Sequence, residues 1–171
     1  MRKLALLIGS LTLMVLLLAL GLSQAGQTDA KAEAGIKKLL DSYRAAVGKQ
    51  DLAAVVKSFA DGPDTVVMGT GPGEVYLGKE SIENAYRAFF SNYKTENSKI
   101  TWMKSGASGN AAWVLGTSLI TQTLEKGKNE FEMNWSVILE KEGGEWKIVA
   151  LHFSNLTGPD VLAPKTKGGK S

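Results

Sequence analysis

His152 is the residue of this chain best suited to acid–base chemistry, because it is the only histidine and an imidazole titrates near neutral pH. As a general acid or base it would need a carboxylate to orient its ring, and the sequence identifies no such partner. The alternative is a histidine that belongs to the fold, hydrogen-bonded at a sheet or a dimer interface. Ser154 is a poor nucleophile beside it, because residues i and i+2 of one strand lie about 7 Å apart. His152 is therefore our candidate catalytic residue, with both roles open.

Aromatic residues with polar groups form the second set of candidates. Such side chains line apolar ligand pockets and leave a hydrogen bond to orient the ligand, although each could equally serve packing alone. The predicted aromatic pocket residues are Tyr43, Tyr76, Tyr86, Trp102 and Trp113, and the predicted polar pocket residues are Asn134 and Ser136.

Composition argues against several other classes of function. One histidine and no cysteine cannot make a standard zinc site, so we expect neither a metal nor a cofactor. The chain carries 20 basic and 17 acidic residues without an arginine-rich stripe, which makes nucleic acid an improbable partner. Stability must come from packing, since no disulfide can form.

The N-terminus resembles a signal for export. Arg2 and Lys3 precede an apolar run, residues 4–22, and small residues follow at Ser23 and Ala25. This pattern predicts a signal peptide over residues 1–25, cleavage near Ala25, and a periplasmic or secreted bacterial protein. The alternative is an uncleaved membrane anchor, because the run is close to the roughly 20 residues that span a bilayer.

The remaining chain has the length of one domain. Residues 26–34 are expected to fray, residues 35–158 to form the domain, and residues 159–171 to be a flexible tail. Apolar spacings of three and four predict a helix over residues 30–48, a short helix after Asp51, and a third from Gly78. Residues 64–68 and 74–77 are predicted to be short strands.

After the third helix the apolar period changes to two. Residues 98–105, 110–125, 129–141 and 145–157 are predicted as long antiparallel strands joined by glycine-containing turns. Alternation predicts which side chains share a face of each strand. In the third of these strands Asn134 and Ser136 lie opposite the apolar set. In the last strand one face should hold Trp146, Ile148, Ala150, His152 and Ser154.

This order is α+β, with about three N-terminal helices laid on a curved antiparallel sheet. The tandem helices, the Gly78–Ile82 start of the third helix, the Gly143–Ile148 hairpin and the closing His152–Ser154 run resemble the SnoaL-like branch of the nuclear transport factor 2-like superfamily. The calmodulin-dependent kinase II association domain is similar. The resemblance covers residues 36–159 and implies a cone with an internal pocket, in which Tyr43 lies over the cone and sheet faces pair in a homodimer.

The resemblance leaves function open, because such cones host isomerases, dehydratases, cyclases, binding proteins and assembly domains. An isomerase-like member would need a pocket carboxylate, but Glu132 and Asp41 are expected to be solvated. We therefore expect a small, largely apolar ligand of unknown identity in the cone. The alternatives are an isomerase-, dehydratase- or cyclase-type enzyme that uses a pocket acid–base residue, and a homo-oligomerisation module. A membrane contact is expected only if the N-terminal segment is not cleaved.

Overall fold

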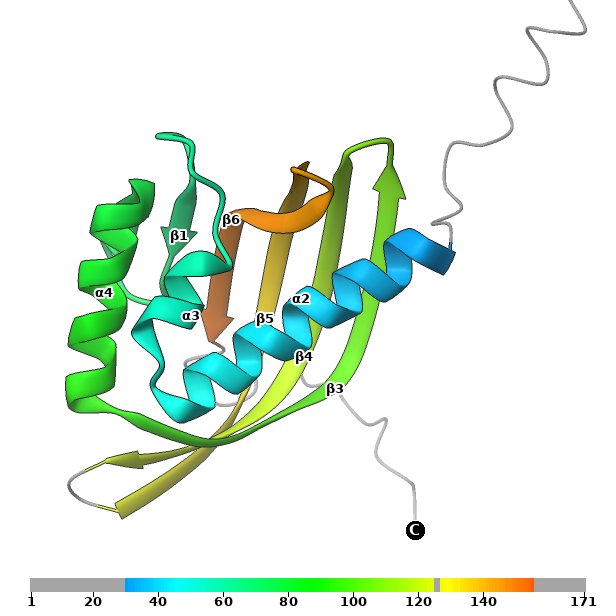
Figure 1. The fold of residues 1–171 in the computed structure, drawn as a ribbon. Helices are drawn as coiled ribbons and strands as arrows, with labels where there is room; N and C mark the ends of the chain where they lie inside the picture. Colours follow the sequence, from blue (N-terminus) through cyan, green and yellow to red (C-terminus); the bar gives the residue numbers. More distant parts are fainter. Residues whose placement is uncertain (1–29, 125–126, 156–171) are drawn as a thin grey trace, which may run out of the picture.

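A computed structural model describes residues 30–124 and 127–155 of the 171-residue chain. The signal peptide predicted for residues 1–25 and the tail predicted for residues 159–171 lie outside the described residues. Within these ranges, three helices and six strands form two layers, with the helices on one face of the sheet (Figure 1). In the described part of the chain, no helix is both long and apolar enough to cross a bilayer.

The longest helix, α2 (Ala30–Lys49), buries Ile36, Leu40 and Tyr43 on one face, as their helical spacing predicts. The helix passes the predicted end at Gly48 by one residue and stops where Gln50 has a positive φ of 56°. This conformation reverses the chain toward α3. From there the Gln50 amide donates hydrogen bonds to the carbonyls of Phe90 (2.9 Å) and Tyr93 (3.1 Å).

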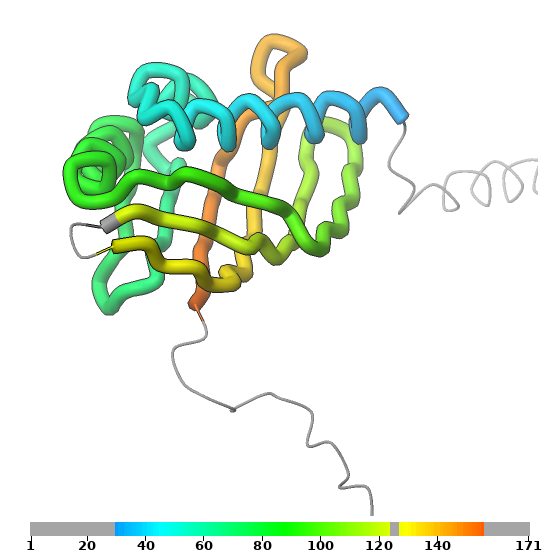
Figure 2. The backbone as a smooth tube through the Cα atoms, turned by 90° about the horizontal axis from the view of Figure 1, so that it is seen from below, coloured from blue at the N-terminus to red at the C-terminus, as the bar shows by residue number. Residues whose placement is uncertain are grey.

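The two shorter helices begin where the sequence predicts. In α3 (Leu52–Lys57) the Asp51 carboxylate accepts a hydrogen bond from the Ala54 backbone N–H (3.0 Å), so Asp51 is the N-cap. Helix α4 (Gly78–Asn92) starts at Gly78, whose φ of 72° favours glycine. It buries Ile82 and Tyr86. Figure 2 shows that the C-terminal end of α2 lies close to both shorter helices, α3 and α4.

The strands form one sheet in the order β2-β1-β6-β5-β4-β3. Its short members are β1 (Val66–Met68) and β2 (Val75–Leu77), and its long members are β3 (Lys94–Ser108), β4 (Ala111–Leu124), β5 (Gly127–Glu142) and β6 (Glu145–Asn155). All neighbours are antiparallel except β1 and β6, which are parallel. The sheet is therefore mostly antiparallel, and the predicted α+β class is confirmed.

The two faces of the sheet have different environments. The inner face packs against the helices and contributes Val114, Val137, Leu139 and Ile148 to the buried core. Outer-facing side chains alternate with these residues, and no described helix covers them (Figure 1). As predicted for β5, Asn134 and Ser136 occupy the face opposite the apolar set.

The last strand changes face in the middle, contrary to the prediction. Ile148 pairs with Leu139 while Ala150 pairs with Ile138, so Val149 is an extra residue in β6. Such a bulge shifts the alternation by one position. Trp146 and Ile148 are buried in the core, whereas His152 lies on the opposite, outer face and is exposed. The single face predicted from alternation is therefore wrong.

Gly116 allows one large ring to lie against the inner face of the sheet. A Cβ atom at this position would lie 2.1 Å from the Trp135 ring. The indole N–H of Trp135 donates a hydrogen bond to the hydroxyl of buried Ser118 (2.9 Å), which fixes the ring over the glycine. Only glycine fits here without moving Trp135.

Gly116→Ala should therefore lower the free energy of unfolding by about 1–3 kcal/mol, the usual cost of overpacking. Urea denaturation followed by tryptophan fluorescence measures the change. The control is Gly48→Ala in α2, where a Cβ atom meets nothing closer than 4.0 Å. It should instead stabilise the helix by about 0.5–1 kcal/mol. Equal stability of Gly116→Ala and the wild type would contradict this account of the ring.

Candidate functional site

The predicted site residues fall into three separate places. Tyr43 and Tyr86 lie in the buried core between α2 and α4. Tyr76 lies in β2, beside a groove against α4. The remaining predicted residues lie on the outer face of the sheet: Trp102, Trp113, Asn134, Ser136 and His152. The structure does not bring the three groups together, and the sequence contained no signal for this division.

Tyr43 and Tyr86 form a buried polar pair inside an aromatic cluster. Their hydroxyl groups are hydrogen-bonded to each other, and either can be the donor. The two rings meet edge to face with centroids 6.3 Å apart, and Phe59 packs against both at 6.2 and 6.1 Å. This geometry is favourable for aromatic rings and satisfies both hydroxyls.

Burial determines the protonation of this pair. Loss of water around the phenolate raises the pKa of Tyr43, with the bond to Tyr86 acting weakly in the opposite direction. Burial also raises the pKa of Tyr86 well above its ordinary value, and the neighbouring Tyr43 adds to the effect. Both phenols are therefore neutral at physiological pH, and neither can act as a general base there.

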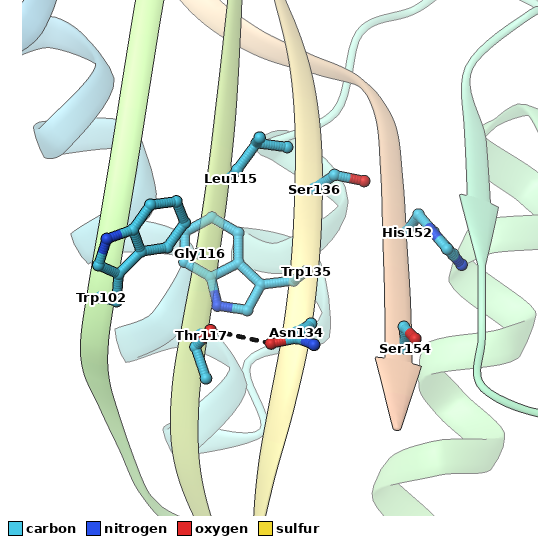
Figure 3. A pocket seen from close by; sticks show the side chains of 9 residues that line it. All are labelled: Trp102, Leu115, Gly116, Thr117, Asn134, Trp135, Ser136, His152 and Ser154. Atoms are coloured by element: carbon cyan, nitrogen blue, oxygen red, sulfur yellow. Dashed lines mark hydrogen bonds between the residues drawn. The ribbon is translucent and has the colours of Figure 1, made fainter. Parts of the chain in front are cut away.

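Four of the five predicted residues of the outer face line a groove of about 280 Å³ (Figure 3). Trp102, Asn134, Ser136 and His152 line it directly. Sequence alternation alone did not select its other lining residues, which are Leu115, Gly116, Thr117, Trp135 and Ser154. Alternation along β4 puts Leu115 and Thr117 on the same face as Trp113. Only the pairing of β4 with β5, and of β5 with β6, places them in one site with His152.

One amide in this groove has a fixed orientation. The Thr117 hydroxyl donates to the Asn134 side-chain oxygen (2.9 Å), as the dashed line in Figure 3 marks. The Asn134 amide nitrogen points toward β6 in the same view. Across the strands, Asn134 pairs with Ser154 and Ser136 pairs with His152. The groove therefore presents an aligned set of uncharged donors and acceptors.

His152 has no partner that would make it a base. Within the described ranges its side chain forms no hydrogen bond or ion pair, and no carboxylate lines the groove. Glu132 is exposed on β5, and Asp41 forms ion pairs with Lys37 and Arg44 on the surface of α2. A catalytic role for His152 stays a prediction, which this geometry does not support.

A second groove, of about 570 Å³, separates β2 from α4 and was not predicted as a site. Tyr76 and Leu77 form its strand side. The helix side consists of Glu80, Ser81, Asn84, Ala85 and Ala88. Residues 30–124 and 127–155 contain no cluster of three or more histidine, cysteine, aspartate or glutamate side chains that could hold a metal ion.

The Tyr43–Tyr86 pair predicts a distinct response to mutation and to alkaline pH. Tyr43→Phe or Tyr86→Phe alone leaves a buried hydroxyl without its partner and should cost about 1–3 kcal/mol, whereas the double variant should be closer to the wild type. Because both pKa values are raised in the fold, the native state retains protons that the unfolded chain loses above about pH 10. Stability from the pair is complete below that pH and falls as pH rises further.

Urea denaturation from neutral pH to about pH 11 measures both effects. The wild type should lose more unfolding free energy over the alkaline range than the double variant, which has no buried phenol to titrate. Parallel pH profiles of the two proteins would show that the pair does not control alkaline stability.

Comparisons with known proteins agree with this geometry. A family model for the SnoaL-like domain matches residues 36–158. A candidate calcium/calmodulin-dependent protein kinase II association domain from Xanthomonas campestris shares 26% identity at a TM-score of 0.64, over 78% of this chain and 91% of that one. No curated protein matches the chain.

Two further structures show the same fold. A ketosteroid isomerase-like protein from Erwinia carotovora atroseptica has 22% identity and a TM-score of 0.63, covering 73% of this chain and 96% of its own. A nuclear transport factor 2-like protein of unknown function from Pseudomonas putida has 20% identity and a TM-score of 0.62, with 75% and 89% covered. Because the family model spans most of the folded residues, the chain belongs to the SnoaL-like domain family and has the nuclear transport factor 2-like cone fold.

Proposed function

We propose that this protein is an exported, non-catalytic assembly module in which two copies pair through the outer faces of their sheets. The observation that carries the proposal is an apolar patch on this face, formed by Trp113, Leu115 and Ile138. These side chains are 40%, 45% and 48% exposed, and Trp113 and Ile138 are direct cross-strand partners. Contiguous apolar surface of this kind is typical of interaction sites.

Trp113 is suited to anchor such an interface. Its ring lies on Gly106 of β3, where a Cβ atom would come within 2.7 Å of the indole. The ring is therefore supported on one side by backbone while the other side remains open. A large aromatic side chain that is already held in place loses little conformational entropy on binding, and tryptophan is enriched among residues that dominate interface energy.

An open sheet face can pair with the same face of a second copy. Two sheets pack face to face at about 10 Å with their strands roughly aligned, and a twofold axis brings the same patch of each copy together. The Xanthomonas protein, which is 26% identical, is described as a candidate association domain, and this description is in keeping with the proposed role. The proposed export is supported by Arg2, Lys3 and the apolar run that follows them.

The apolar patch gives a direct test by sedimentation velocity. The wild type should be a dimer at micromolar concentration, and the variant Trp113→Lys/Ile138→Lys should be monomeric because it places charges in the desolvated contact. Met103→Lys is the matched control, since Met103 is 40% exposed on the opposite face of β3. Circular dichroism checks that each variant is folded. A monomeric wild type, or a dimer that survives the double substitution, refutes the proposal.

Binding of a small apolar ligand within the cone is a second candidate function. It is favoured by a set of apolar side chains on the inner face that remain only half-buried, namely Phe131, Met133, Trp135 and Phe153. Phe153 and Trp135 are cross-strand partners, so the set is continuous. An apolar ligand that covered them would remove further apolar surface from water.

Native mass spectrometry of protein purified from its producing cells tests this second candidate. A bound ligand should appear as an added mass that is lost in Trp135→Ala, while the Trp113→Lys/Ile138→Lys variant should retain it because the patch is on the other face. Wild-type protein that carries no added mass would contradict a resident ligand.

A further inference from the structure

We propose that the groove between β2 and α4 binds an extended basic peptide, which adds as a strand to the free edge of β2. This β2–α4 groove has a volume of about 570 Å³. Tyr76 lies on its strand side, and Glu80, Ser81 and Asn84 are the polar residues on its helix side. The proposal goes beyond dimer formation and uses none of the residues of the apolar patch.

The β2–α4 groove lies on the helix side of the sheet, away from the proposed dimer contact. Tyr76 pairs with Val67 of β1, which is buried in the core, and Tyr76 packs against the same core. Because paired residues of neighbouring strands point to the same face, Tyr76 faces the helices. The other side of the groove is α4, which lies on the face opposite the apolar patch (Figure 1). A second copy on the outer face therefore leaves the groove open.

The two edges of the sheet differ in their protection against pairing. The described strands end with β3 on one side and β2 on the other. Strand β3 has two register irregularities and carries the exposed residues Lys94, Lys99 and Lys104, and both features hinder the addition of another strand. Strand β2 is short and uncharged, and its terminal residues Val75 and Leu77 are 51% and 61% exposed. The β2 edge is therefore the one open to a further strand.

The hydrogen bonds between β1 and β2 determine which main-chain groups face this free edge. The Gly78 N–H donates to the Thr65 carbonyl, and the Gly69 N–H donates to the Glu74 carbonyl, both at 2.8 Å. Hydrogen-bonded pairs alternate along an antiparallel ladder, so Tyr76 directs its main-chain groups toward β1. The residues on either side of Tyr76 direct theirs toward the free edge.

Two of these edge groups remain for a peptide. The Val75 N–H already donates to the Gly73 carbonyl (2.8 Å), and the Leu77 carbonyl, at the N-cap of α4, accepts the first bond of the helix. The Val75 carbonyl and the Leu77 N–H are left, one on each side of Tyr76. One residue of a parallel strand can donate to the first and accept from the second. Its side chain then lies beside Tyr76, in the β2–α4 groove.

The charge of the groove indicates which side chain fits there. Among the described residues that line it, Glu80 is the one charged group, and it forms no ion pair with another described residue. The neighbouring charges of α4 are already paired, Glu83 with Arg87 and Lys79 with Asp61. A lysine or arginine of the peptide therefore complements Glu80.

The remaining lining residues suit a long basic side chain. The half-buried Tyr76 ring contacts no other aromatic ring in the described ranges, so it offers a surface to methylene groups and to a cation. The Ser81 hydroxyl and the Asn84 amide form no side-chain hydrogen bond with another described residue. Both can accept a hydrogen bond from an ammonium or guanidinium group.

Titration of the full-length wild-type protein with a short capped peptide of alternating valine and lysine tests this site. In ¹H–¹⁵N NMR spectra, the peptide should shift the Leu77 main-chain N–H and the Asn84 side-chain NH₂ signals at millimolar concentration. The same peptide with methylated main-chain nitrogen atoms should not, because it cannot donate to the Val75 carbonyl. A peptide of alternating valine and glutamate should not bind either, because its charge has the same sign as Glu80.

Matched variants test the recognition of charge. Glu80→Gln should weaken binding of the lysine peptide about three- to fivefold, the usual effect of losing an exposed ion pair. Glu83→Gln removes the same charge from the same helix, outside the groove, and should bind like the wild type at physiological salt. The Trp113→Lys/Ile138→Lys variant should also bind like the wild type, so failure of the dimer proposal leaves this test intact.

Three results would overturn the proposal. The first is the absence of shifts at Leu77 and Asn84 with the lysine peptide. The second is equal binding of the methylated peptide, which would exclude strand addition to β2. The third is an equal loss of affinity, or none, in Glu80→Gln and Glu83→Gln, whose folding the same spectra report. That result would show that the groove does not recognise the basic side chain.

Discussion

The contact between α2 and the inner face of the sheet is the constraint on which the rest of the structure depends. Ile36 and Leu40 belong to the same buried core as Val114 and Val137 of the central strands. Because successive strand residues point to opposite faces, burying one set directs the other set to the opposite side. The choice of residues that the helices cover therefore also decides which residues form the outer face, with its apolar patch and the groove lined by Trp102 and Asn134.

The bulges at Thr101 in β3 and at Val149 in β6 modify this rule beside the groove. In a regular strand, Trp102 would share a face with inner-facing Ile100, and His152 would share one with Trp146. The extra residues Thr101 in β3 and Val149 in β6 place both side chains outside instead. The core is preserved because Ile100 and Ile148 keep their inward positions. Each bulge thus keeps the core residue before it on the inner face and exposes a residue that follows it, Trp102 or His152, to solvent.

The buried core contains a pair of hydrogen-bonded hydroxyl groups, those of Tyr43 and Tyr86. Two phenols that bond each other need no water and no charged partner, so they can lie among Phe59 and the core aliphatics. This use of two tyrosines joins α2 to α4 across a long sequence separation. Tyr43 and Tyr86 are residues of a type that suits a ligand pocket, but their hydroxyl groups are hydrogen-bonded to each other.

Much of the fold was predictable because local patterns determine it. The helical spacing of Ile36, Leu40 and Tyr43, the cap at Asp51 and the start of α4 at Gly78 all depend on neighbouring residues and are confirmed. The predicted end of α2 differed by one residue, because the positive φ occurs at Gln50. The parallel pairing of β1 with β6 joins distant segments, and it was not predicted.

The candidate site was less predictable, since its residues are assembled by strand pairing. Alternation placed Asn134 and Ser136 together, but their neighbours on β3, β4 and β6 depend on register, and register depends on bulges that have no strong sequence signal. The sequence by itself determined the elements, the apolar faces of α2 and β5, and the family. Only the tertiary structure decided that His152 faces outward and that Tyr43 bonds Tyr86, because both follow from contacts between segments far apart in the chain.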